Sequence, residues 1–275
     1  APLKNHIRLS CTSFVQIPAE APFTNLRFFC SGCFMIKRDQ IYTEDFDLVE
    51  EFRFDEGVAT VFSDMIRRSV PGYGMVLSLV GVLAERYLQS GGRGYDLGAS
   101  LGASTLAMAA AAAERGAALV AVDNSPSMVE RCRENLKTAQ GVEIDLRCED
   151  IRQTVIHSAS FVTMNFTLQF LPIEEREQQL RSVAEGLQPG GALMLSEKIR
   201  FEDPEQQQRM ESLHHAFKRA NGYSELEISQ KRSALEAVLI TETLEQHFER
   251  LHGVGFKQVE VIFQTLNFVS ILAVR

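Results

Sequence analysis

The sequence predicts an α/β fold built on one mostly parallel sheet with helices on both faces. Three observations lead to this prediction. Short apolar runs alternate with helical stretches, a glycine turn joins the first run to a long alanine-rich helix, and the last two runs are joined too tightly for a helical crossover. Seven strands are therefore expected, the last two as an antiparallel edge pair, at residues 93–97, 118–122, 142–148, 160–164, 192–197, 259–263 and 266–274.

Size and composition narrow the class of protein. The chain has 275 residues, of which 45% are hydrophobic, enough to bury one large core, and it contains no apolar run long enough to cross a membrane. A formal net charge of −8 argues against a large electrostatic nucleic-acid surface. We therefore expect small-molecule chemistry, with neither direct nucleic-acid binding nor membrane association.

Cysteine usage favours a reducing, cytoplasmic compartment. The count of five is odd, and Cys132 and Cys148 fall in an expected helix and an expected strand, which is not the pattern of a disulfide framework. Cys30 and Cys33 have the spacing of a redox or zinc pair, but no second pair and no nearby histidine pair accompany them. We therefore expect no metal.

The domain organisation follows from changes in pattern along the chain. Residues 1–34 lack a sustained period of 2 or 3.6, so they are expected to form a poorly ordered extension, and residues 35–275 a single domain beginning at Met35. Residues 201–252 are almost wholly helical and interrupt the sheet, which predicts a helical lid. Amphipathic patterns predict further helices at residues 52–66, 75–87, 128–138 and 173–187.

The glycine turn after the first strand is a candidate ligand site. Gly98 and Gly102 allow the backbone to turn tightly and a ligand to approach closely, and the helix that follows points its free N–H groups at that ligand. Ser100 stands where the middle glycine of a dinucleotide-type turn is expected. A plain connection between strand and helix remains the alternative.

An acid at the tip of the second strand strengthens the ligand interpretation. Asp123 ends the apolar run 118–122, and Ser125 with Pro126 opens the next helix as N-cap and first helical residue. A carboxylate at this edge of a parallel sheet can accept both hydroxyls of a ribose. The alternative is a solvated loop acid that helps to start the helix.

Other candidates lie at the ends of neighbouring strands. Asp150 and Ile151 follow the third strand, where an acid and an apolar side chain suit an adenine ring, and Asn165 ends the fourth. Tyr73 lies on a Pro-Gly turn between two helices, from which it either covers a ligand or caps the core.

Arg232 is the cation most in need of a partner. The stripe Ile228, Arg232, Leu235 and Leu239 follows helical spacing and places a guanidinium on an otherwise apolar face. A buried charge without a partner is costly, so either Glu236, another acid or an anionic ligand must pair with it.

Longer motifs carry a family resemblance. The segments YDLGASLGA, VAVDNSP, CEDI, MNFTLQFL and LQPGGALMLSEK resemble the class I S-adenosylmethionine-dependent methyltransferases, which have a Rossmann-like fold. FDEGVATVFSDMIRRSVPGY and HHAFKRANGYSELEISQKRS are similar to one group with that fold, the carboxy-S-adenosyl-L-methionine synthases. The resemblance extends from about Met35 to the end of the chain.

The resemblance also implies residue roles. Nine residues would hold S-adenosyl-L-methionine or its carboxylated product: Tyr73 over the ligand, Gly98, Ala99 and Ser100 at its amino-acid end, Asp123 and Asn124 on the ribose, Asp150 and Ile151 on the adenine, and Asn165 near the sulfonium. Ala99 stands where related sequences often have cysteine, and only its backbone need matter. Arg232 would pair with the added carboxylate, in a pocket of a homodimer completed by the second subunit.

The implied activity uses no metal. Prephenate would donate the carboxyl group and leave as phenylpyruvate, while the methyl group of S-adenosyl-L-methionine loses a proton towards an ylide that captures the carbon dioxide. The product is the carboxymethyl donor for the tRNA wobble uridine. The residues leave the proton-abstracting base unidentified and leave two other functions open, a methyltransferase acting on a small molecule or on tRNA, and a non-catalytic adenosine-ligand binding protein.

Overall fold

The computed structural model describes residues 37–44, 52–236 and 238–275. The expectations for residues 1–34, including those for Cys30 and Cys33, lie outside this range. The strands are β1 (Arg93–Leu97), β2 (Ala118–Asp123), β3 (Ile144–Cys148), β4 (Ala159–Asn165), β5 (Leu187–Lys198), β6 (Gln258–Thr265) and β7 (Phe268–Val274). The α-helices are α1 (Glu56–Ser69), α2 (Tyr73–Tyr87), α3 (Ala103–Arg115), α4 (Pro126–Leu136), α5 (Ile173–Gly186), α6 (Pro204–Ala220), α7 (Glu225–Glu236) and α8 (Leu244–Gly253).

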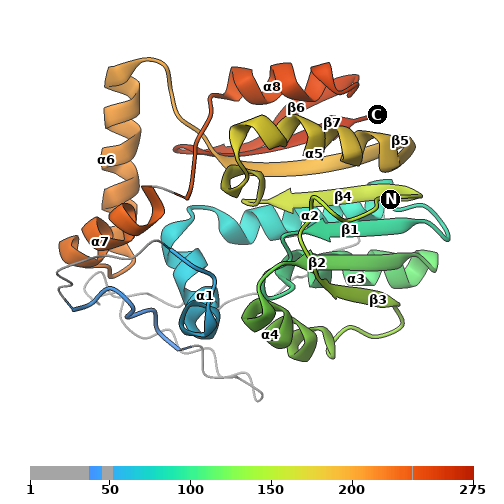
Figure 1. Ribbon diagram of the computed structural model, residues 1–275, viewed down its shortest axis with the longest axis horizontal. Coiled ribbons are helices and arrows are strands. Elements are labelled where there is room, and N and C mark those ends of the chain that lie inside the picture. The colour runs from blue at the N-terminus through green and yellow to red at the C-terminus, as the bar shows by residue number, and fades with distance from the viewer. Residues whose placement is uncertain (1–36, 45–51, 237) are drawn as a thin grey trace, which may run out of the picture. The chain divides into compact units, whose positions relative to one another are not determined.

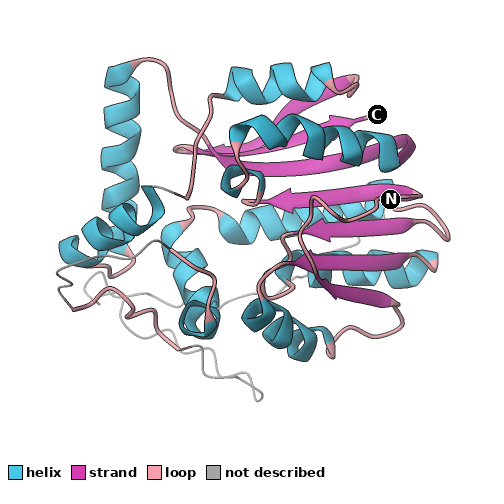
Figure 2. Cartoon of the chain, in the orientation of Figure 1, coloured by secondary structure: helices cyan, strands magenta, loops and turns pink. Residues whose placement is uncertain are grey.

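The described strands form one sheet in the order β3-β2-β1-β4-β5-β7-β6 (Figure 2). The first five pair in parallel, while β7 is antiparallel to both β5 and β6. This arrangement confirms the predicted mostly parallel sheet with an antiparallel edge pair. Because the parallel strands run the same way, the tips of β1, β2 and β4 meet at one edge, where ligands of such sheets bind.

Helices cover both faces of the sheet (Figure 1). On one face, Val80 of α2 and Met108 of α3 pack on Leu119 and Phe161. On the other face, the core includes Leu180 of α5 and Leu251 of α8. Alternation along a strand directs neighbouring residues to opposite faces, which explains how one sheet supports two separate cores.

Helix starts are set by side-chain caps, of which the one at Ser125 was expected from the sequence. Ser125 accepts a hydrogen bond from Met128 N, and Asp203 accepts from Glu205 N and Gln206 N. Because these side chains satisfy amide groups of the first turn, the helices begin directly after them. Helix α4 therefore begins at Pro126 and ends at Leu136, two residues earlier at each end than expected.

Strand β5 begins earlier than expected. The segment 188–191 was expected to separate a helix from a strand that starts at Ala192, but β5 begins at Leu187, whose partner on β4 is Ala159. Gly190 N donates to Arg275 O, and Arg275 N donates to Gly191 O. These bonds to the end of the chain hold the Pro-Gly-Gly segment in the sheet, with Gly190 in the left-handed region at φ 77°.

The helical segment 201–252 divides into two parts. Helices α6 and α7 lie beyond the carboxyl ends of the parallel strands (Figure 1). Helix α8 instead contributes Leu251 to the main core, so it belongs to the helical layer on the sheet. Helices α6 and α7 therefore make up the described part of this segment that stands off the sheet, and their role as a lid stays a prediction.

Candidate functional site

A cavity of about 800 Å³ opens at the carboxyl edge of the sheet. This volume lies within the usual range for small-molecule sites. Nine of the ten candidate residues line it: Tyr73, Gly98, Ala99, Ser100, Asp123, Asn124, Asp150, Ile151 and Asn165. The exception is Arg232. Sequence positions up to 92 residues apart, from Tyr73 to Asn165, are thus brought together by the way the strands end.

The glycine turn requires glycine at Gly98. Its φ is 85°, and a Cβ atom added there would lie 2.2 Å from Thr167 Oγ1. The amide groups of Gly98 and Ala99 both donate to Val122 O, at 2.9 and 2.8 Å. The turn is therefore held against the end of β2, and it forms part of the cavity wall rather than a plain connection between strand and helix.

Ser100 joins this turn to Asp123. Its φ of 47° places it in the left-handed region, and its amide donates to Asp123 Oδ2 at 2.8 Å. Ser125 N donates to the other oxygen, Oδ1, at 2.9 Å. Asp123 is only 9% exposed, so the alternative of a solvated loop acid was wrong. Burial raises the pKa of Asp123, while the two amide donors lower it. Each oxygen keeps a further lone pair for a ligand hydroxyl.

Asp96 is not among the candidates from the sequence, but it connects β1 to the elements around the turn. Its Oδ2 accepts from Thr105 Oγ1 of α3 at 2.6 Å, and its Oδ1 accepts from Thr163 Oγ1 of β4 at 3.1 Å. Burial raises its pKa to about 6, against the opposing effect of these hydrogen bonds. The available signal was an acid within an apolar strand, two residues before Gly98.

The end of β3 carries an ion pair that no sequence pattern predicts. Asp150 accepts from Arg152 Nε at 2.9 and 3.0 Å, and this partner holds the pKa of Asp150 below its ordinary value. Arg152 also pairs with Glu175 at the start of α5. Ile151 next to them is 7% exposed. An apolar surface thus lies beside a carboxylate of fixed orientation.

Asn165 is oriented through both ends of its amide. Its Nδ2 donates to Ser104 Oγ at 2.9 Å, and its Oδ1 accepts from Ser196 Oγ at 2.7 Å. Ser196 is bonded in turn to Ser270 on β7 at 2.8 Å. The chain of hydroxyl groups fixes the Asn165 side chain at the tip of β4, where it lines the cavity.

Tyr73 is the first residue of α2, not a turn residue. It lines the cavity and belongs to none of the three buried clusters in the described part of the chain, which favours covering a ligand over capping the core. Burial raises the pKa of its hydroxyl, and Asp96 adds to this effect. The phenol is therefore neutral at physiological pH.

The expected burial of Arg232 was wrong. Arg232 is exposed and does not line the cavity, while Lys231, directly before it, is 4% exposed and does. Successive helical residues point about 100° apart, so only one of the two can face inward. The inward stripe contains Ile228, Lys231 and Leu235, at spacings of three and four. The side chain of the alternative partner, Glu236, is outside what the structure describes.

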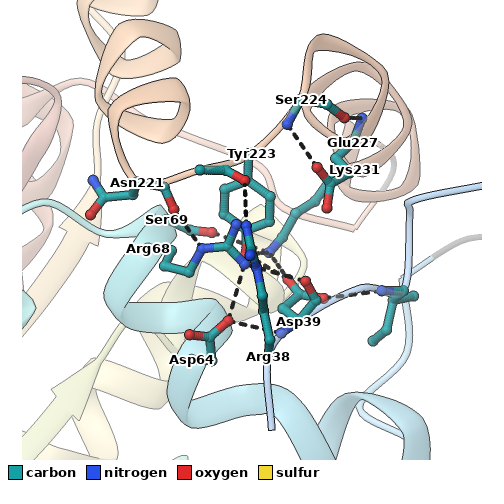
Figure 3. Close-up of polar contacts among 12 residues, drawn as sticks. Arg38, Asp39, Asp64, Arg68, Ser69, Asn221, Tyr223, Ser224, Glu227 and Lys231 are labelled. Atoms are coloured by element: carbon teal, nitrogen blue, oxygen red, sulfur yellow. Dashed lines mark hydrogen bonds and ion pairs between the residues drawn. The ribbon is translucent and has the colours of Figure 1, made fainter. Parts of the chain in front are cut away.

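Lys231 belongs to a buried polar network (Figure 3). Its Nζ lies 3.1 Å from Ser69 Oγ and 3.4 Å from both Asp39 Oδ2 and Tyr223 OH. The Tyr223 hydroxyl donates to Asp39 Oδ2 at 2.5 Å. Burial lowers the pKa of Lys231 to about 8, although Asp39 opposes the shift. A buried lysine with a lowered pKa thus lines the cavity on the side of α7.

Neither a metal cluster nor a membrane span is found in the described residues. No group of three or more histidine, cysteine, aspartate or glutamate side chains within 37–44, 52–236 and 238–275 has the arrangement of a metal site. None of the helices described has both the length and the apolar character for crossing a membrane. Metal independence itself stays a prediction.

Comparisons with known proteins agree with this geometry. Residues 95–191 match the family model described as a methyltransferase domain. The carboxy-S-adenosyl-L-methionine synthase of Hahella chejuensis is 51% identical over 244 residues, which cover 86% of this chain and 98% of the relative. The protein of the same name from Geobacter metallireducens is 52% identical over 87% of this chain and 99% of its own length.

Solved structures extend the comparison to the fold. An O-methyltransferase family protein from Burkholderia thailandensis has a TM-score of 0.57 at 14% identity, over 80% of this chain and 60% of that one. Human N-acetylserotonin methyltransferase has a TM-score of 0.54 at 15% identity, over 80% of this chain and 55% of that one. At these identities the likeness concerns the class I methyltransferase fold alone.

Proposed function

Because the chain belongs to the carboxy-S-adenosyl-L-methionine synthase family, we propose that it converts S-adenosyl-L-methionine and prephenate to carboxy-S-adenosyl-L-methionine and phenylpyruvate. The product supplies the carboxymethyl group for modification of the tRNA wobble uridine. The observation that carries the proposal is the convergence of nine candidate residues in one cavity, in a chain that matches its relatives over nearly their whole length.

The described residues fit S-adenosyl-L-methionine. Asp123 has oxygen lone pairs for the two ribose hydroxyls, and Ile151 with Asp150 offers an apolar surface and an acceptor for an adenine. The turn from Gly98 to Ser100 forms cavity wall and has no side chain at Gly98, so the amino-acid end can lie close to its backbone. Each of these assignments remains part of the proposal.

The reaction needs a dry site and a second, anionic reactant. A sulfonium acidifies its attached methyl group, and exclusion of water strengthens that effect. Phe54, Phe62 and Phe170 line the cavity and supply apolar wall. No histidine lines the cavity within the described residues, so we propose that the hydroxyl group leaving prephenate, rather than a histidine, takes up the proton.

Arg232 enters the proposal through a second copy of the chain. On its own chain it is exposed and does not line the cavity, so we propose that it meets the carboxylate in the cavity of a partner. A guanidinium matches a carboxylate through two parallel hydrogen bonds, which distinguishes a carboxymethyl group from a methyl group. We propose a homodimer for this reason. The free cysteines Cys132 and Cys148 support a cytoplasmic location.

The test is a product assay with the purified protein. Incubation with S-adenosyl-L-methionine should yield a species heavier by one carboxyl group, only when prephenate is present and together with phenylpyruvate. Mass spectrometry detects all three compounds. Formation of S-adenosylhomocysteine with a methylated acceptor would instead identify an ordinary methyltransferase, the function favoured by the general methyltransferase model over residues 95–191. Binding without turnover of any kind would identify a carrier.

A further inference from the structure

The two ends of the cavity carry different charges. The strand-tip end is lined by Asp123, Asp150 and Glu174, whose groups accept hydrogen bonds, and by Arg152, whose charge is already paired with Asp150 and Glu175. The end formed by α1 and α7 is lined by Arg67 and Lys231. An adenosine ligand with a sulfonium has use for acceptors, but it presents no anion that requires two cations away from its amino-acid end.

The hydrogen bonds of the Lys231 ammonium are long for a buried charged group. Its three polar contacts measure 3.1 to 3.4 Å, longer than the usual 2.7 to 2.9 Å of a charge-assisted hydrogen bond. Asp39, its only acidic contact among the described residues, also accepts from Tyr223 OH at 2.5 Å and from Ile41 N at 3.3 Å. The carboxylate is therefore shared, and the ammonium retains capacity to bind another anion.

The neighbouring charges add to the need for an anion. Arg68, next to Ser69, stacks 3.8 Å from the centre of the Tyr223 ring and pairs with Asp64 (Figure 3). Lys218 is 8% exposed, and its ammonium has no hydrogen-bond or ion-pair partner within the described residues. The positive charges of Lys231, Lys198 and Arg232 act on it, and burial together with these charges lowers the pKa of Lys218 to about 7. Desolvated cations in excess favour an incoming anion.

We propose that Lys231 binds a carboxylate of the second substrate, an anionic carboxylic acid, in the cavity of its own chain. The assignment rests on the proposed function, in which that substrate is the dicarboxylate prephenate. Ser69, Asp39 and Tyr223 act as positioning residues that hold the ammonium at the cavity wall. Consecutive residues of α7 thereby serve two anions, with Lys231 facing inward and Arg232 facing outward.

Other cations fit this role less well. Arg67 lines the same end but is exposed, so solvent screens its charge. Lys198 and Lys218 are desolvated but do not line the cavity. Lys231 alone, of the lysines in the described ranges, combines burial with a place in the cavity wall.

Equilibrium binding of prephenate tests the assignment. Protein saturated with S-adenosylhomocysteine, which has no methyl group to carboxylate, is titrated with prephenate by calorimetry. Lys231→Met is expected to weaken prephenate binding at least tenfold and to change S-adenosylhomocysteine affinity less than twofold. Lys218→Met is the matched control, since it removes an equally buried cation that does not line the cavity, and its effect on prephenate should stay below threefold. Melting temperatures report on folding.

A second variant covers the risk that Lys231→Met does not fold. Lys231→Gln keeps a hydrogen-bond donor near Ser69 and Asp39 but removes the charge, and the same tenfold loss of prephenate affinity is expected. Prephenate affinity equal to wild type in either folded variant, or an equal loss in Lys218→Met, would overturn the assignment and leave the proposed function standing. Failure of the wild type itself to bind prephenate would overturn both.

Discussion

The strand-tip end and the α7 end of the cavity are built in different ways. At the strand tips, the turn after β1 and the acid that ends β2 are joined by a hydrogen bond from a backbone amide to a carboxylate, Ser100 N to Asp123 Oδ2 at 2.8 Å. At the α7 end, Lys231 meets Asp39 and Ser69, which are 192 and 162 residues away in the chain. The first end depends on how parallel strands terminate, whereas the second depends on how distant segments pack.

Under the proposed function, this difference separates recognition of the nucleoside from recognition of the anion. The strand-tip end is a general feature of such folds, because parallel strands place their carboxyl ends at one edge of the sheet. The α7 end depends on the lid helices α6 and α7, which stand off the sheet (Figure 1). Substitutions at the two ends should therefore change the binding of different ligands.

The largest effect is expected at Arg232. Arg232→Leu should leave stability and S-adenosyl-L-methionine binding largely intact, because the side chain is exposed on its own chain. It should weaken binding of carboxy-S-adenosyl-L-methionine by roughly 2 to 5 kcal/mol, the range for truncating one partner of a buried charge pair. Lysine should rescue only partly, since it lacks the planar fork.

Isothermal titration of both ligands measures this prediction. Arg219→Leu serves as the control, because Arg219 is also an exposed arginine of the lid, paired with Glu225. Equal losses of affinity for both ligands, or a loss of stability alone, would assign Arg232 a structural role. Arg232 would then not determine specificity for the carboxylated ligand.

A smaller effect, confined to the strand-tip end, is expected at Gly98. Gly98→Ala combines a φ of 85° with a Cβ only 2.2 Å from Thr167 Oγ1, so it should destabilise the protein by about 3 kcal/mol. Gly190→Ala is the matched control: its φ is 77°, but no atom lies within 4 Å of the added Cβ. It should cost about 1 kcal/mol. If urea denaturation gave similar losses of unfolding free energy for both variants, the close approach to Thr167 would not contribute to the requirement for glycine.

The strand-tip end was accessible to sequence reasoning because its geometry is local. An apolar run followed by Gly98, and another followed by Asp123, each predicts a strand that ends at a polar group. Parallel pairing then brings the tips together without further information. The same argument placed Asp150 and Asn165 correctly in the cavity wall.

The α7 end was not accessible in the same way. Helical spacing permits both i+3 and i+4 neighbours of Ile228, so Lys231 and Arg232 fit the pattern equally well, and only packing decides between them. The sequence pattern of α8 also fits a lid helix. Only the burial of Leu251 in the main core shows that α8 packs on the sheet. Asp39 lies too far along the chain for any local pattern to join it to Lys231.

Lys218 should make stability depend on pH. Its folded-state pKa of about 7 lies below its ordinary value of 10.5, so between these values the unfolded chain binds more protons and stability rises with pH. From pH 7 to 8.5 the wild type should gain about 1.6 kcal/mol relative to Lys218→Met. Denaturation curves of both proteins at several pH values give this difference, with Lys137→Met as an exposed control. Parallel pH profiles for wild type and Lys218→Met would mean that Lys218 is not desolvated in solution.

The smallest effect is expected from removing residues 1–34. They lack helical or strand periodicity, and the family resemblance begins at about Met35. Deleting them should change melting temperature and ligand affinity very little. A truncated protein that fails to fold would show that the domain does not begin at Met35.

The most direct test of whether the two ends of the cavity act separately compares two variants in their binding of two kinds of ligand, the nucleoside ligands and prephenate. Asp123→Ala should weaken S-adenosyl-L-methionine and S-adenosylhomocysteine by a similar factor of about ten or more, through the loss of ribose hydrogen bonds. Once S-adenosylhomocysteine is raised to saturation, that variant should bind prephenate nearly as well as the wild type. Lys231→Met should show the reverse pattern, with prephenate affinity lowered and S-adenosylhomocysteine affinity kept. If both variants lost affinity for the same ligand to the same extent, the two ends of the cavity would not have separate tasks.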